Sequence, residues 1–255
     1  MKQIPVAVQL YSVRDEAEKD FAGTVKKIAE MGYDGVELAG LYGLSTKEVL
    51  EALQEAELPA VSAHVPIEEF ADDLDQTLDQ YEALGCRWIA IPWLPEERRP
   101  GGERYEETLK LIREISEGCG SRGMQLLYHN HAFEFEKTAE GVSLLDQLYA
   151  DVPAGVLDAE PDLCWVQVGG EDPCAFLKKY RGRCPVLHMK DFVWKDGEAE
   201  LTVLGQGEAA VKAAAQTGAE CGAEWFVIEQ DDHPAGTPME NMEQGLFFLK
   251  KCMEE

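Results

Sequence analysis

The chain of 255 residues lacks the features that mark membrane-spanning and secreted proteins. It has no stretch of about 18 apolar residues, which excludes a membrane-spanning helix. It has no Cys-x-x-Cys pair, and its seven cysteines are an odd number, so we expect reduced thiols rather than a disulfide framework. Residues 1–5 contain no signal-type apolar segment, and we therefore expect a cytoplasmic location.

Basic residues are also scarce. Lys and Arg number 23 against 49 Asp and Glu, which gives a formal net charge of −26 at pH 7. A surface this acidic repels phosphate backbones and anionic lipid headgroups, and no Lys/Arg run would build a local basic groove. We therefore expect neither nucleic acid nor a membrane as a partner. The excess of carboxylates either serves solubility or includes a group that converges to hold a cation.

Apolar residues make up 45% of the chain, and the length suits one α/β barrel, which takes about 250 residues. Eight short apolar runs are interpreted as strands, and most are rich in β-branched residues, as strands buried on both faces are. The runs are Val6–Leu10, Gly35–Leu38, Ala60–Ala63, Trp88–Ile91, Gln125–Tyr128, Gly155–Asp158, Pro185–His188 and Phe226–Glu229.

Segments with a helical period lie between these runs, at 21–31, 46–58, 70–84, 105–119, 141–149, 173–180, 209–222 and 239–253. Before the next strand, several of them meet a glycine, which suits a left-handed C-cap: Gly32, Gly85, Gly123 and Gly222. The strands start at roughly the 24–40-residue spacing of βα units. The sequence therefore predicts a single (β/α)8 TIM-barrel domain over residues 1–255. A doubly wound open sheet is the alternative, but no Gly-x-Gly-x-x-Gly follows the first strand.

The five histidines share one kind of position, directly after an apolar, strand-like run. They are His64, His129, His131, His188 and His233. Histidines scattered over the surface would also fall within helices. In a barrel the carboxyl ends of the strands form the face that carries the active site. The pattern therefore predicts that these strand ends meet where chemistry takes place.

One imidazole or carboxylate from each of the last four strands makes the most economical metal site. The set is His129, Asp162, His188 and Glu229, with Asp158 or Glu160 as alternatives to Asp162. Mixed nitrogen and oxygen ligands suit one divalent ion such as Mn, Zn, Co, Fe or Mg better than they suit Ca²⁺. A lone carboxylate at a strand end more often caps a helix, so the prediction depends on the four residues together.

Other side chains at the strand ends are candidates for contacts with a substrate: Gln9, Tyr11, Glu37, His64, Trp93 and Trp165. Aromatic rings stack on the apolar faces of sugars, but they also fill the mouths of barrels. Glu37 is equally suited to a structural ion pair. Phe133 and Phe135 extend the same aromatic group.

Seven segments carry a family resemblance: Val8–Arg14, Gly32–Glu37, Ser62–His64, Tyr128–Phe135, Asp162–Val166, His188–Asp191 and Glu229–Asp231. Through them the chain resembles the xylose isomerase-like TIM-barrel superfamily, in particular its sugar phosphate isomerase/epimerase branch. The resemblance covers nearly the whole chain, and the segments at strands five and seven are the most specific.

The resemblance implies one divalent metal held by Glu, Asp, His and Glu from strands five to eight. The last three correspond to Asp162, His188 and Glu229, whereas His129 stands where many relatives have glutamate. In epimerases of the family both metal-bound glutamates exchange protons with the substrate, so this departure counts against a simple two-glutamate epimerase. The histidine-rich end of strand five is similar to that of inosose dehydratase-like members and of members that cleave 3-keto-glycosides by elimination.

The chemistry that follows is removal of a proton next to the carbonyl of a small sugar or keto-sugar, through an enediolate. The candidate bases are Glu229, Glu134 and His131, in that order, and Lys190 is a candidate to stabilise the oxyanion or bind a polar group. Reprotonation gives isomerisation or epimerisation. Loss of a β-substituent gives dehydration or glycoside cleavage, and the sequence leaves both outcomes open.

Two further classes compete with this interpretation. A non-catalytic sugar-binding subunit would keep the barrel without the chemistry. A repair endonuclease would share the fold, but the charge of −26 argues against it. Since only Arg14 and Lys190 are basic at the inferred rim, we expect a neutral, unphosphorylated sugar as the small-molecule partner. A homo-oligomer is compatible with the sequence.

Overall fold

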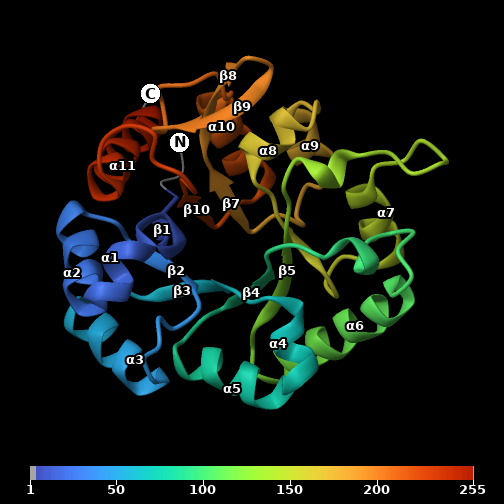
Figure 1. Cartoon of the computed structure of the whole chain (residues 1–255), viewed down its shortest axis with the longest axis horizontal. Coiled ribbons are helices and arrows are strands. Elements are labelled where there is room, and N and C mark those ends of the chain that lie inside the picture. Colours follow the sequence, from blue (N-terminus) through green and yellow to red (C-terminus); the bar gives the residue numbers. More distant parts are fainter. Residues whose placement is uncertain (1–3, 255) are drawn as a thin grey trace.

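The computed structural model describes residues 4–254 and forms a nearly closed parallel barrel, as the strand pattern predicts. Eight strands make one sheet in the order β6-β5-β4-β3-β2-β1-β10-β7, and helices surround it (Figure 1). The strands are β1 (Val6–Gln9), β2 (Gly35–Ala39), β3 (Ala60–His64), β4 (Trp88–Ile91), β5 (Gln125–His129), β6 (Asp158–Glu160), β7 (Val186–Met189) and β10 (Trp225–Ile228).

The α-helices are α1 (Arg14–Lys19), α2 (Phe21–Met31), α3 (Thr46–Glu55), α4 (Ile67–Asp72), α5 (Leu74–Ala83), α6 (Tyr105–Ser121), α7 (Leu144–Asp151), α8 (Leu163–Val168), α9 (Pro173–Lys179), α10 (Val211–Cys221) and α11 (Pro238–Glu254). The predicted left-handed caps are confirmed, because Gly32 and Gly222 end α2 and α10 with φ of 92° and 105°. Over residues 4–254, no helix combines the length and the apolar character needed to cross a membrane.

The barrel closes between β6 and β7, where only an isolated parallel bridge joins Asp162 to His188. The amide of His188 donates to the carbonyl of Pro161 at 3.0 Å, and the amide of Ala159 donates to the carbonyl of Arg183 at 2.7 Å. Two candidate metal ligands therefore lie on the seam of the barrel, and closure of the fold brings them together.

Strand six was predicted three residues too early, at 155–158. Gly155 has a φ of 83°, and the amides of Val156 and Leu157 donate to the carbonyl of Pro153, so this apolar run forms a turn. The observed strand, Asp158–Glu160, is mostly polar yet fully buried. A search for apolar runs cannot find such a strand, because its side chains contact other polar groups in the barrel.

Two further predictions differ from the structure. The helix expected over 70–84 is two helices, since Asp73 has an extended φ of −156° and its side chain caps α5 through the amide of Gln76. No strand was expected between strand seven and the helix at 209–222. The chain there forms an antiparallel hairpin of β8 (Asp191–Lys195) and β9 (Glu198–Thr202), at the top of Figure 1.

Candidate functional site

The inward-facing side chains change from apolar to polar along β5 and β7. Leu127 and Val186 belong to a compact apolar cluster that also contains Trp88 and Val227. Two residues further along their strands come His129 and His188, which share the same face because side chains alternate with a period of two. The barrel is therefore a packed core that ends in a layer of titratable groups at the carboxyl ends of its strands.

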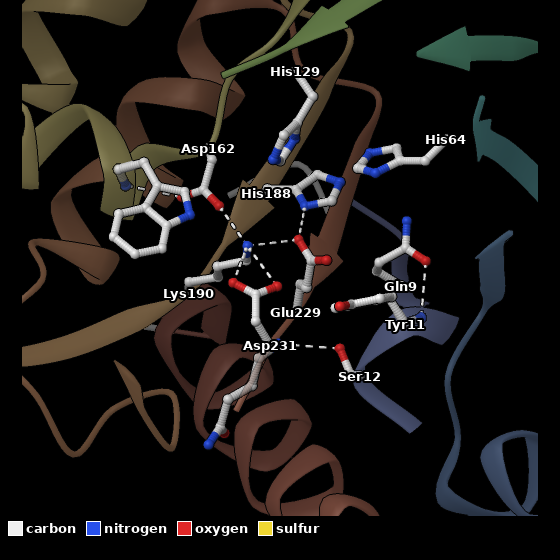
Figure 2. Close-up of polar contacts among 12 residues, drawn as sticks. Gln9, Tyr11, Ser12, His64, His129, Asp162, His188, Lys190, Glu229 and Asp231 are labelled. Atoms are coloured by element: carbon white, nitrogen blue, oxygen red, sulfur yellow. Dashed lines mark hydrogen bonds and ion pairs between the residues drawn. The ribbon is translucent and has the colours of Figure 1, made fainter. Parts of the chain in front are cut away.

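The four residues predicted to bind a metal lie together in this layer. One ligand atom from each of them lies within 4.8 Å of those from the other three, and all four side chains are buried: His129, Asp162, His188 and Glu229. His188 Nδ1 lies 2.9 Å from Glu229 Oε2. Figure 2 shows His129 above His188 and Asp162 to its left. A second group with ligand-like spacing consists of His64, His129, Glu160 and His188.

Lys190 lies among the carboxylates of the site. Its ammonium is 2.8 Å from Glu229 Oε2, 3.1 Å from Asp162 Oδ2 and 3.0 Å from Asp231 Oδ2 (Figure 2). Burial opposes the charge, but the three carboxylates raise the pKa of Lys190 well above its usual value. The ammonium therefore stays protonated and compensates part of the negative charge.

A polar cluster lies deeper in the barrel, where Glu37 and Glu160 approach each other from opposite sides. His64 Nε2 is 2.6 Å from Glu160 Oε1 and 3.1 Å from Glu37 Oε1. His188 Nε2 is 3.0 Å and 2.7 Å from the same two oxygens. Gln9 Nε2 donates to Glu37 Oε1 at 2.8 Å. His188 thus joins the two clusters, with Nδ1 facing Glu229 and Nε2 facing the deeper carboxylates.

Burial and neighbouring charges shift the pKa values of these groups. Burial raises the pKa of Glu37, and the nearby Glu160 raises it further. Burial alone would raise the pKa of Glu229, but Lys190 and His188 lower it well below its usual value. Burial, reinforced by His188, lowers the pKa of His129. A neutral His129 beside an ionised Glu229 is the protonation state that metal ligands require.

The unsatisfied buried atoms of these residues suit a divalent cation. Glu160 Oε2, Asp162 Oδ2 and His129 Nδ1 are buried and have no hydrogen-bond partner among the described residues. Asp162 Oδ2 lies 3.1 Å from the Lys190 ammonium and His129 Nδ1 lies 3.4 Å from Glu160 Oε1, but neither contact has hydrogen-bond geometry. Buried carboxylates are costly unless they are paired or coordinate a metal. Nitrogen and oxygen donors in this arrangement fit a transition-metal or magnesium-type ion.

A cavity of about 450 Å³ opens above this layer. Its lining includes His129, His131 and Glu229 from the strand ends, together with several residues of the rim: Tyr11, His64, Trp93, Glu69 and Asp231. Tyr11 and Trp93 are each 44% exposed, so their rings are accessible to a ligand. The volume suits a small molecule such as a single sugar ring.

Three expected substrate contacts do not line this cavity. Gln9 and Glu37 are fully buried beneath it and hold the deeper cluster. Trp165 lines a neighbouring groove instead, although its ring centroid is 6.2 Å from that of His131. Phe135 also points away from the rim, because it packs against Phe176 in the outer core.

Glu134, expected among the candidate bases, is turned away from the cavity. Its Oε1 accepts from the Tyr128 hydroxyl at 2.8 Å, and its Oε2 accepts from the amide of His131 at 2.7 Å. Both oxygens are therefore engaged in holding the loop after β5. The geometry favours a positioning role for Glu134, and we do not propose it as a base.

The buried position of Glu134 leads to a prediction about stability. Burial raises its pKa from 4.5 to about 7, so the folded state holds a proton that the unfolded state releases at lower pH. The contribution of this group is present below about pH 4.5 and is lost as the pH rises to about 7, by roughly 3 kcal/mol. Glu134→Gln should remove this part of the fall in the free energy of unfolding with rising pH. Urea unfolding at pH 5 and pH 7.5 would measure it. The exposed neighbour Glu136→Gln should keep the wild-type slope, and equal slopes for all three proteins would refute the assignment.

Four of the five histidines lie close together, namely His64, His129, His131 and His188. His233 lies apart from the cavity lining, with Nε2 donating to the carbonyl of Ser12 at 2.8 Å and Nδ1 facing the Asn241 amide at 2.9 Å. His233 follows the end of β10 by five residues, and it ties that loop to Ser12 in the 3-10 helix Leu10–Val13 that comes after β1.

Two carboxylates of the cavity lining, Asp231 and Glu69, are not among the residues expected at the site. Asp231 follows Glu229 by two residues on the same side of the chain, a signal that period-two spacing carries. Glu69 comes from α4, and no strand-end pattern points to it. Its position depends only on how the loop after β3 folds over the barrel.

Comparison with known proteins places this architecture in a family. The model of the xylose isomerase-like TIM barrel matches residues 25–252. An inosose dehydratase of Clostridium botulinum (strain Alaska E43 / Type E3) is 22% identical, over 92% of this chain and 90% of that protein. A sugar phosphate isomerase/epimerase structure from Parabacteroides distasonis ATCC 8503 superposes with a TM-score of 0.84 at 22% identity, covering 98% of both chains. A second structure of that description from the same organism gives a TM-score of 0.80 at 20% identity, covering 98% of this chain and 94% of the other.

These structural likenesses, all below 25% identity, show the fold, and the family match covers most of the chain. The resemblance seen in the strand-end segments is thereby confirmed. The protein belongs to the xylose isomerase-like TIM-barrel family, with distant relatives that include inosose dehydratases.

Proposed function

We propose that this protein is a divalent-metal-dependent enzyme of the isomerase/epimerase type, which removes a proton next to the carbonyl of a small sugar or keto-sugar. One observation carries the proposal. Four potential ligands from consecutive strand ends lie close enough together to hold one ion: His129, Asp162, His188 and Glu229. Two of them, His129 and Glu229, also line a sugar-sized cavity. When bound, a divalent ion supplies polarisation of a carbonyl oxygen.

The chain's own residues would perform the proton transfer. Glu229 lines the cavity, and the low pKa that Lys190 and His188 impose keeps it ionised, so it is our first candidate for the base. His131 also lines the cavity, and burial lowers its pKa to about 4, which leaves a neutral imidazole as the second candidate. The Lys190 ammonium, 2.8 Å from Glu229, is suited to stabilise negative charge on an enediolate oxygen.

Binding of the sugar ring would fall to the rim. Tyr11 and Trp93 present accessible aromatic faces, and His64 lies beside them as a hydrogen-bonding group. Only Glu229 among the four proposed ligands is a glutamate, so a symmetrical exchange between two metal-bound glutamates has no counterpart here.

This last feature favours a second candidate function. The same enediolate that is reprotonated in an isomerase expels a β-substituent in a dehydratase, and elimination needs only one base on the carbon. The relatives named inosose dehydratase align over 86–92% of the chain, which supports this outcome.

Solvent-exchange labelling tests the shared first step. Protein supplied with Mn²⁺, Zn²⁺, Co²⁺, Fe²⁺ or Mg²⁺ in D₂O should introduce deuterium at the carbon next to the carbonyl of a ketose, an inosose or a 3-keto-glycoside. Mass spectrometry of the recovered sugar would then separate epimerised products from products that have lost water or a substituent. Absence of label from every member of the panel, with every metal, would overturn the proposal.

A further inference from the structure

The hairpin β8–β9 forms a second wall beside the cavity. It begins at Asp191, immediately after Lys190, so its base is joined directly to the candidate site. The Asp191 carboxylate accepts hydrogen bonds from four backbone amides, each at 2.9 Å: Phe192, Gly205, Gly207 and Ala209. Hydrogen bonds to a charged acceptor are stronger than neutral ones, so the base of the hairpin is firmly held.

Packing anchors the hairpin as well. Phe192 and Leu201 form a buried apolar cluster with Cys164, and Trp165 packs against this cluster. The hairpin is therefore a built feature of the fold, held by its packing against α8.

A groove of about 510 Å³ lies between this hairpin and the loop after β10. Asp231 lines both the groove and the central cavity, so the two spaces adjoin at this residue. Trp165 forms part of the groove wall, and its ring lies 5.7 Å from the Lys190 ammonium and 6.2 Å from the His131 ring. Each space alone is within the size range of a small-molecule site, about 300–1,000 Å³. Together they exceed the needs of one sugar ring.

The chemistry of the groove selects against anions. Its lining carries five carboxylates, and its one lysine, Lys195, pairs with Glu200 at 2.8 Å. Asp231 pairs with Lys190, so a phosphate group would still meet the carboxylates of Asp196, Glu198 and Asp232 there. Sugar hydroxyls, by contrast, donate hydrogen bonds to carboxylates, and the face of Trp165 suits the apolar side of a ring. The Trp165 indole N–H is buried and has no hydrogen-bond partner among residues 4–254.

We propose that the groove between the β8–β9 hairpin and the loop after β10 binds a second, uncharged sugar unit, so that the preferred ligands are neutral disaccharide-like keto-sugars. The inference rests on the proposed function, in which the reacting ring occupies the central cavity. The hairpin then sets the length of the substrate, and the acidic lining excludes its phosphorylated counterparts.

Ligand binding to the full chain with Mn²⁺ tests the groove, by calorimetry with D-fructose, D-fructose 6-phosphate and three disaccharide ketoses of different linkage. These are turanose, lactulose and isomaltulose. At least one disaccharide should bind about tenfold more tightly than fructose, the gain expected for one stacked ring. Trp165→Leu should bring that disaccharide to within about twofold of fructose. Trp194→Leu is the matched control, because Trp194 lies on the same hairpin, is 49% exposed and is outside the groove lining.

A second variant guards against misfolding of Trp165→Leu. Glu198→Lys changes an exposed residue of the groove and should strengthen binding of fructose 6-phosphate relative to fructose. The inference is overturned if no disaccharide binds more tightly than fructose, or if Trp194→Leu weakens binding as much as Trp165→Leu does. In that case the labelling experiment still decides the proposed function. No label from any sugar would remove the proposed function itself, and the inference with it.

Discussion

His188→Ala is expected to remove the bound divalent metal and to lower solvent exchange by roughly 10³-fold or more, if loss of the cation costs several kcal/mol of transition-state stabilisation. His188 is fully buried and links Glu229 through Nδ1 to the deeper carboxylates through Nε2. Its loss therefore removes one ligand and frees the carboxylates that it orients. Metal content by elemental analysis and deuterium uptake by mass spectrometry would measure the two effects, with circular dichroism to confirm folding.

His233→Ala is the matched control for this experiment. It changes another histidine that follows a strand, yet His233 bonds to Ser12 and Asn241 rather than to the proposed ligands. Metal content and exchange should stay at the wild-type level. Chelation with EDTA should reproduce the His188→Ala result in the wild-type protein. Sugar binding that persists in EDTA, together with no deuterium uptake in metal-loaded protein, would instead indicate the sugar-binding subunit.

Glu229→Gln is expected to lower exchange by about 10²–10⁴-fold, the usual contribution of a general base. The amide keeps the size of the carboxylate but cannot take up a proton at neutral pH. Because Glu229 is also a proposed ligand, metal content must be measured alongside the rate. The expected signature is a loss of rate that persists when Mn²⁺ is raised to restore occupancy.

Glu134→Gln provides the comparison that separates the two candidate glutamates. The Glu134 oxygens accept hydrogen bonds from Tyr128 and from the amide of His131. The Glu134→Gln substitution should therefore reduce solvent exchange by less than the roughly 10²-fold expected for loss of a base. A larger effect at Glu134 than at Glu229 would reverse our assignment. So would a Glu229→Gln protein that exchanges at the wild-type rate with metal bound.

Most strands could be predicted because they are apolar and buried on both faces. The glycine caps were equally readable, since a positive φ after a helix leaves a residue-specific signal. The position of strand six was not predicted because Asp158 and Glu160 are polar yet buried inside the barrel, whereas polar residues are usually exposed. The β8–β9 hairpin was not predicted because its outer half is exposed and carries no continuous apolar run.

The candidate ligands could be predicted because barrel topology ties strand ends to one face. The sequence could not predict which of these side chains point inward, because a shift of one residue moves a side chain to the opposite face. Glu134 illustrates the limit: it follows the same strand as His129 and His131, yet the short turn at Phe133–Phe135 directs it behind the cavity.

The amino-acid sequence by itself determined the α/β barrel, the family resemblance and the set of strand-end residues from which the site is built. These follow from local periodicity and from residue type, which need no long-range contact to be recognised. Only the tertiary structure decided that His188 faces Glu229 on one side and Glu37 with Glu160 on the other. It also decided that Lys190 lies among the carboxylates and that the hairpin adds a groove. Such relations join residues up to 151 positions apart, and they depend on barrel closure and side-chain packing.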